Sequence, residues 1–173
     1  AMAAAGHAAT VGPMAAVAAA IAWAGIDAMV EEGATFCVID NGGDIALVAD
    51  RPVRVGVHAG SAPLSSKVAF VVPPAGSVQG ICTSSASVGP SISFGVADAV
   101  TVFSKDPALA DAWATAICNR IRADDTSVLS GLDPREVTGV FAILGDRTEQ
   151  WGNLPPLVNA VVDEHLISAG DRL

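Results

Sequence analysis

The stretch of residues 8–26 carries no charged side chain and consists chiefly of alanine, and this feature constrains the fold most strongly. A leader peptide or a membrane span is disfavoured, because no basic segment precedes the stretch, Pro13 interrupts it and alanine gains little free energy in a bilayer. We therefore predict one long, largely buried helix. Thr10 or Gly12 lies near its N-cap, Pro13 lies in its first turn, and Gly33 ends it.

Composition limits the size and packing of the core. The chain has 173 residues, of which 51% are hydrophobic, and it contains five Phe, three Trp and no Tyr. This length suits one domain over residues 1–173, with a core of small side chains in which helices pack closely on a sheet. A domain of this kind often buries further surface as a homodimer, which is a possible assembly here.

The formal net charge of -9 limits the partners. Phosphate backbones and anionic lipids both require clustered Lys and Arg, and the nine basic residues are scattered. We therefore expect neither nucleic-acid nor membrane binding. Three widely spaced cysteines without a C-x-x-C pair indicate a reducing, cytoplasmic location. Cys37 and Cys118 lie in apolar patterns as small buried side chains, whereas Cys82 precedes a polar loop.

Short apolar runs separated by turn residues predict antiparallel strands. Residues 35–72 have the pattern of a β-meander, and residues 76–97 are irregular. A second helix begins at Asp106 and the following proline, and a strand covers the segment VTGVFAILGD. A tail begins at Trp151, and its final residues are expected to be a short helix or frayed. The fold class is α+β, with antiparallel sheets packed with helices.

The first candidate site is the segment NGGDI, residues 41–45. Gly42 and Gly43 allow unusual backbone angles or close approach of a ligand, and Asn41 and Asp44 flank them. The alternative is a plain hairpin turn, for which Asn-Gly and Gly-Gly are common signals.

The second candidate is a chain of hydroxyl groups, residues 83–89, beginning with Thr83, Ser84 and Ser85. Hydroxyls and backbone amides can hold phosphate or isoalloxazine carbonyl groups without a positive charge. The alternative is a flexible polar loop. A nucleophilic serine would require a base, and no motif connects the three histidines, His7, His58 and His165, to this loop.

The third candidate is the pair Asp111 and Thr115, which share one face of the second predicted helix. One carboxylate and one hydroxyl can hold Mg²⁺ when phosphates and water supply the other ligands. The alternative is a polar surface pair without a function. Asp98, the fourth candidate, could serve the same pocket or end a turn.

Taken together in their order, NGGDI, the Thr-Ser segment, ADAVTV and ALADAWATA resemble the ApbE superfamily, which includes the FAD:protein FMN transferases. The likeness is greater to a small cytoplasmic branch, through VGPMAAVAAAIA, RPVRVGVHAG and ICTSSASVGPSISFGVADAVTVFSKD. It covers roughly residues 11–122 and the GVFAILGD and WG segments. Relatives usually carry a further N-terminal segment, which is expected to be absent here.

The resemblance implies a T-fold-related α+β fold that holds FAD or FMN between the GGD turn and the Thr-Ser segment. By the ADA-x-x-TA motif of the transferases, Asp111 and Thr115 would bind Mg²⁺. The transferases also carry a His-x-Ile-Asp-Pro stretch, and residues 89–93 here read GPSIS, without the histidine and aspartate. Phe94 is the aromatic residue best placed by sequence to stack on a flavin ring.

Three functions remain open at this point. The leading one is binding of a flavin or nucleotide, with weak transfer chemistry at most. The second is an active Mg²⁺-dependent FMN transferase in which another residue, such as Asp98, replaces the missing base. The third is a non-catalytic accessory protein in sulfur or amino-acid metabolism, a role loosely associated with this branch.

Overall fold

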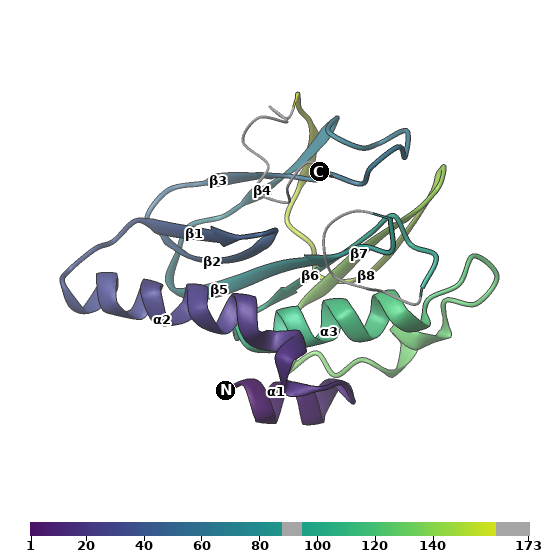
Figure 1. Ribbon diagram of the computed structural model, residues 1–173. Coiled ribbons are helices and arrows are strands. Elements are labelled where there is room, and N and C mark those ends of the chain that lie inside the picture. The colour runs from purple at the N-terminus through teal and green to yellow at the C-terminus, as the bar shows by residue number, and fades with distance from the viewer. Residues whose placement is uncertain (88–94, 162–173) are drawn as a thin grey trace, which may run out of the picture.

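The computed structural model describes residues 1–87 and 95–161, which form three layers (Figure 1). Helices α2 and α3 cover one face of a six-stranded antiparallel sheet, and α1 packs against the outer side of α3. A three-stranded sheet lies over the other face. The fold class is therefore α+β, as the sequence predicts.

The helical layer contains two long helices and three short elements. Pro13 begins a 3₁₀ turn that runs directly into the Ala-rich helix, and Gly33, with φ of 92°, follows its end, as predicted. The separate helix before residue 10 was not predicted. The elements are α1 (Met2–Ala9), η1 (Pro13–Ala16), α2 (Val17–Glu31), α3 (Pro107–Arg120) and η2 (Ser127–Gly131).

The prediction that the Ala-rich helix is largely buried is wrong. Met14 and Ile21 are 68% and 62% exposed, and Val30 is also exposed, so one face of the helix has no cover among the described residues. Ala19, Ala22 and Ile26 form the buried face. By length and composition alone, the stretch Pro13–Glu31 could cross a membrane, but a core helix of a globular protein passes the same test.

The large sheet has the order β1-β2-β5-β6-β7-β8, with every pair of neighbours antiparallel. Its strands are β1 (Cys37–Asn41), β2 (Asp44–Ala49), β5 (Ala75–Ser84), β6 (Ala99–Ser104), β7 (Gly139–Leu144) and β8 (Arg147–Gly152). The small sheet has the order β3-β4-β9, with β3 (Val53–Gly56), β4 (Val68–Val72) and β9 (Leu157–Asn159).

Two predictions about strands require correction. The segment 35–72 is not one meander, because β2 pairs with β5 while β3 and β4 form a hairpin in the other sheet. The irregular segment begins with the ten-residue strand β5, which lies inside the large sheet. The described part of the tail contains strands, because Trp151 belongs to β8 and residues 157–159 form β9. The prediction for the final residues of the tail, 162–173, falls outside the described residues.

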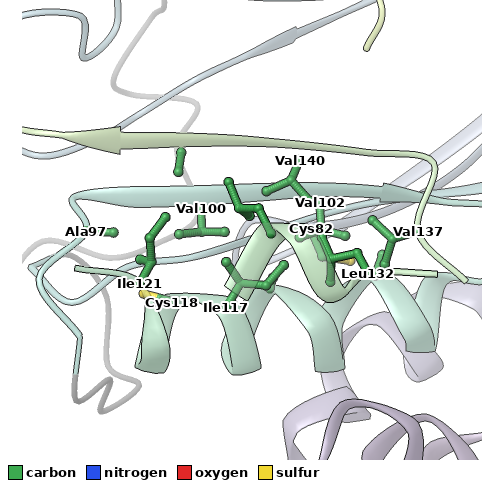
Figure 2. Close-up of a cluster of buried hydrophobic side chains, with 14 of the residues drawn as sticks. Cys82, Ala97, Val100, Val102, Ile117, Cys118, Ile121, Leu132, Val137 and Val140 are labelled. Carbon is green, nitrogen blue, oxygen red and sulfur yellow. The ribbon is translucent and has the colours of Figure 1, made fainter. Parts of the chain in front are cut away.

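The two faces of the large sheet have separate cores. Beneath α3, Val100 and Val102 pack against Ile117 and Ile121, and Cys82 lies among them (Figure 2). On the opposite face, Phe70 of the small sheet makes edge-to-face contacts with Phe103 and Phe141. All three cysteines are buried. Cys82 belongs to strand β5 and lies in the core, not at the entrance to a loop.

Candidate functional site

The NGGDI segment forms the tight turn between β1 and β2. Gly42 and Gly43 both have positive φ, 72° and 97°, which suits glycine in a two-residue hairpin. The N–H of Gly43 donates to Oδ1 of Asp40 at 2.8 Å and fixes the turn. The hairpin interpretation therefore describes the backbone correctly, and any ligand role of this segment belongs to the side chains that flank the glycines.

The two flanking side chains point toward the helical layer. Nδ2 of Asn41 donates to the carbonyl oxygen of Ala18 at 3.1 Å, so it fixes the first turn of α2 to the end of β1. Asp44 alternates with Ala46, which packs on α2, so the Asp44 side chain also lies on the helical face of the sheet.

Asp111 reaches the same region from the middle of α3. Its side chain is buried, and its Oδ2 accepts a hydrogen bond from the N–H of Ala19 at 3.2 Å. The first amides of a helix have no partner within the helix, and α2 has no side-chain cap of its own. Asp111 therefore supplies a cap to α2 from another helix. Thr115 lies one turn further along α3, half-buried.

The carboxylates of Asp44 and Asp111 lie close enough to interact electrostatically. The pKa of Asp44 is raised to about 8, chiefly by burial and secondly by the negative charge of Asp111. Burial also raises the pKa of Asp111 to about 6, against the lowering effect of the amides of Ala19 and Ala18. Within residues 1–87 and 95–161, neither carboxylate forms an ion pair with Lys or Arg. The pair therefore lacks a compensating positive charge from the described chain.

The donor set of this pair suits a hard cation. Two carboxylates and the nearby Thr115 hydroxyl are oxygen ligands, which Mg²⁺ and Ca²⁺ prefer. No group of three or more His, Cys, Asp and Glu side chains with metal-binding geometry occurs in the described part of the chain. A cation bound here would therefore need further oxygen ligands, such as phosphate and water.

Cys82 lies on β5, opposite Asp44 in the register of the sheet. Its thiol is fully buried and makes a 3.6 Å contact with the carbonyl oxygen of Pro107. Burial raises the pKa of the Cys82 thiol well above its usual value, and the charges of Asp44 and Asp111 raise it further. The thiol is therefore uncharged at neutral pH and is a poor nucleophile.

The hydroxyl segment is divided between the two faces of the sheet. Thr83 alternates with Cys82, and its Oγ1 bonds Oγ1 of Thr101 at 2.9 Å on the face of the small sheet. Ser84 alternates back to the helical face, the face of Asp111. Ser85 is buried after the strand and accepts a hydrogen bond from the N–H of Ser87 at 3.0 Å. Thr83 and Ser84 therefore belong to a strand rather than to a flexible loop.

Asp98 connects two loops. Its Oδ2 accepts the N–H of Gly145 at 2.7 Å, and its Oδ1 accepts the hydroxyl of Ser87 at 3.4 Å. These contacts give Asp98 a structural role. Phe94 and residues 89–93 lie outside the described residues, so their predicted roles stay predictions.

Sequence reasoning did not find the meeting of Asp44 with Asp111 or the role of Asn41 as a helix anchor. The only sequence signal for the meeting is a buried aspartate in an otherwise apolar helix, in the segment ALADAWATA. A carboxylate in such a place requires a partner, and the partner is 67 residues away in the chain, given by positions 111 and 44.

Comparisons with known proteins agree with this architecture. Residues 1–146 match the family model described as AbpE bacteria. A UPF0280 protein of Methanoregula boonei is 68% identical over 164 residues, covering 94% of this chain and 69% of the relative. A UPF0280 protein of Methanosphaerula palustris is 59% identical over 170 residues, covering 98% and 72%.

One solved structure, the apo form of the flavinyl transferase ApbE of Pseudomonas stutzeri, superposes with a TM-score of 0.57 at 17% identity. The match covers 93% of this chain, which spans about half, 52%, of that solved chain. At this identity the likeness shows a shared fold.

Proposed function

This chain belongs to the AbpE bacteria family, and on that premise we propose that it binds a flavin or nucleotide, FAD or FMN first among them, together with a divalent cation. The ligand lies between the β1–β2 turn and the end of β5. The cation lies on Asp111 and Thr115, and Asp44 is its second carboxylate neighbour.

The observation that carries the proposal is an uncompensated pair of carboxylates, the buried Asp111 and the half-buried Asp44. Two like charges in a buried site cost free energy unless a proton or a cation neutralises them. The raised pKa values of Asp44 and Asp111 mean that protons neutralise the two groups when no cation is bound. A divalent cation is the other way to neutralise the pair, because it allows both carboxylates to ionise.

The cation also accounts for how a strongly acidic chain could hold a phosphate-containing ligand. In the described residues, no Lys or Arg forms an ion pair with either carboxylate, so no such side chain stands beside the pair to bind phosphate. When bound, the cation would neutralise phosphate charge and polarise a phosphoanhydride bond. Ser84 and Ser85, at the end of β5, can donate hydroxyl hydrogen bonds to the same ligand.

The neutral parts of the ligand would meet fixed polar groups. The backbone of the glycine turn is rigid because Asp40 holds Gly43. Asn41 acts on the site by positioning α2 through Ala18, and Thr83 contributes through its backbone because its side chain lies on the other face. Phe94 keeps its proposed stacking role on the flavin ring.

The test is a calorimetric and thermal-shift titration with FAD, FMN and ADP, each with and without Mg²⁺. We expect FAD to raise the melting temperature only when Mg²⁺ is present, and Asp111→Asn to abolish this shift. Asp106→Asn is the matched control, because Asp106 caps the same helix through the N–H of Leu109 and asparagine also caps well. The absence of a response to every flavin and nucleotide would contradict the proposal and favour the accessory role.

FMN transfer is the second candidate function. It is supported by the spacing of Asp111 and Thr115 one turn apart on α3, and by the fold shared with a flavinyl transferase. In such a step a threonine hydroxyl oxygen of an acceptor bonds the FMN phosphorus, the bond to AMP breaks, and the hydroxyl proton passes to a base. Asp98 is a poor base because both its oxygens already accept hydrogen bonds. Mass spectrometry of a threonine peptide incubated with FAD and the protein decides this point, since transfer adds one FMN group and releases AMP.

A further inference from the structure

A cavity lies on the opposite side of α3 from the site just described. It has a volume of about 370 Å³, within the range of small-molecule sites. Trp113 and Arg120 line it from α3, and at 100° per residue both lie about 180–200° around the helix from Asp111. The remaining lining residues belong to the segment after the helix: Asp125, Ser127, Val128 and Gly131.

The cavity contains one charge of each sign. Nη2 of Arg120 donates to the carbonyl oxygen of Ala9 at 3.1 Å, which anchors the guanidinium while leaving its other N–H groups to donate. The carboxylate of Asp125 accepts the N–H of Ser127 at 2.9 Å. No ion pair joins Arg120 and Asp125 in residues 1–87 and 95–161. The two charges are therefore held apart by their own backbone contacts.

The wall between these charges is apolar and fixed. The indole of Trp113 is half-buried, and its Nε1 donates to Oε2 of Glu136 at 3.0 Å, so the ring cannot rotate freely. Val128 is also half-buried, and both side chains pack against the core beneath α3.

We propose that this cavity binds a free α-amino acid with an apolar side chain. The carboxylate of the ligand pairs with Arg120, its ammonium group pairs with Asp125, and its side chain lies against Trp113 and Val128. A simple anion is repelled by Asp125, and a simple cation is repelled by Arg120. The guanidinium of the neighbouring Arg122 donates to the carbonyl oxygens of Asn119 and Ile121, and its positive charge also acts on the Asp125 carboxylate.

The first experiment uses the fluorescence of Trp113 as the reporter, in a Trp23→Phe and Trp151→Phe background. L-leucine is titrated beside L-leucinamide, which lacks the carboxylate, and 4-methylpentanoate, which lacks the ammonium group. We expect saturable binding of leucine, and affinities at least about tenfold lower for both analogues, because each loses one charged hydrogen-bonding pair. No saturable change with leucine, or equal binding of either analogue, would overturn the proposal.

The second experiment changes the protein. Arg120→Met and Asp125→Asn should each weaken leucine binding by at least about tenfold in calorimetry. The matched controls, Arg54→Met on β3 and Asp124→Asn beside the cavity, should bind leucine as the parent does. Should Arg120→Met fail to fold because it loses its bond to Ala9, the isosteric Asp125→Asn and its control still decide. Unchanged affinity for leucine in Asp125→Asn would contradict the proposed binding of the ammonium group. Because Arg120 and Asp125 lie away from Asp111, the flavin titration is independent of this result.

Discussion

The carboxylate of Asp111 accepts a hydrogen bond from the backbone N–H of Ala19, at 3.2 Å, across the contact between α3 and α2. The N-cap residue of α2 supplies no side-chain cap, so this carboxylate caps the helix at Ala19 while also interacting with Asp44. Asp111 therefore combines a structural role with the proposed role of cation ligand. Variants can separate the two, because capping requires only an acceptor oxygen, whereas cation binding requires the charge.

We expect Asp111→Asn to be at least as stable as the parent, because it keeps an acceptor and removes a charge that burial disfavours, and Asp111→Ala to lose about 1–3 kcal/mol of unfolding free energy relative to Asp111→Asn. Asparagine keeps an acceptor for Ala19, whereas alanine leaves that N–H without a partner. Urea denaturation near neutral pH measures the difference. Equal losses in both variants would mean that the charge of Asp111, and not its acceptor oxygen, stabilises α2.

The carboxylates of Asp44 and Asp111 predict a stability that falls as pH rises. The pKa values of Asp44 and Asp111, about 8 and about 6, lie above their ordinary value of 3.8, so between these values the folded state binds more protons than the unfolded state. Unfolding free energy should therefore be greatest below this window and decrease through it, by at most about 1.4 kcal/mol per pH unit for each proton. Urea titrations without divalent cations, at about pH 5 and about pH 8, measure the decrease.

Asp44→Asn should flatten this dependence, because the group with the higher pKa no longer titrates. Asp50→Asn removes an equal formal charge at an exposed position and should leave the slope unchanged. Restoration of stability at the higher pH by Mg²⁺ would follow from the proposed cation site. An equally steep slope in Asp44→Asn would show that general charge repulsion, and not this pair, sets the pH dependence.

Sequence patterns predicted local structure well where a backbone signal was strong. Pro13 and Gly33 marked the Ala-rich helix, and the acidic cap at Asp106 marked α3. The same patterns failed for β5, because glycine and serine are typical of loops, yet Gly80 is required where the strand lies against α3. Tertiary packing overrides propensity at this position.

The candidate site depends on long-range contacts that no local pattern contains. Thr83 and Ser84 are neighbours in the chain, but strand geometry places their hydroxyls on opposite faces of the sheet. The burial of α2 was mispredicted for the same reason. Composition indicates a helix, but it does not show which residues cover each of its faces. The proximity of Asp44 and Asp111 depends on the order of the strands in the sheet, which the sequence does not determine.

Asn41 is predicted to stabilise the start of α2. Its amide donates to the carbonyl oxygen of Ala18 at 3.1 Å, so Asn41→Ala should cost about 0.5–1.5 kcal/mol of unfolding free energy. Amide hydrogen exchange should increase in the first turn of α2 and not at its end. Asn153→Ala, on an exposed side chain, is the control. Uniform exchange rates along α2 in both variants would contradict an anchoring role.

Gly80 and Gly76 provide a matched test of the contact that places α3 on the sheet, because both lie in β5. A Cβ at Gly80 would lie 2.5 Å from Cα of Pro107 and 3.2 Å from Cβ of Ala110, whereas a Cβ at Gly76 meets nothing within 4 Å. Backbone at this distance must move, so Gly80→Ala should lose about 1–3 kcal/mol of unfolding free energy, while Gly76→Ala should be neutral or slightly stabilising.

The shift in Gly80→Ala should also reach the candidate site, because Pro107 begins the helix that carries Asp111. We expect weaker Mg²⁺-dependent stabilisation by FAD in Gly80→Ala than in Gly76→Ala, measured as the change in melting temperature at equal ligand concentration. If the two variants have equal stability, the close contact between β5 and α3 does not constrain the helix. If stability falls but the FAD response is unchanged, the start of α3 adjusts without displacing Asp111.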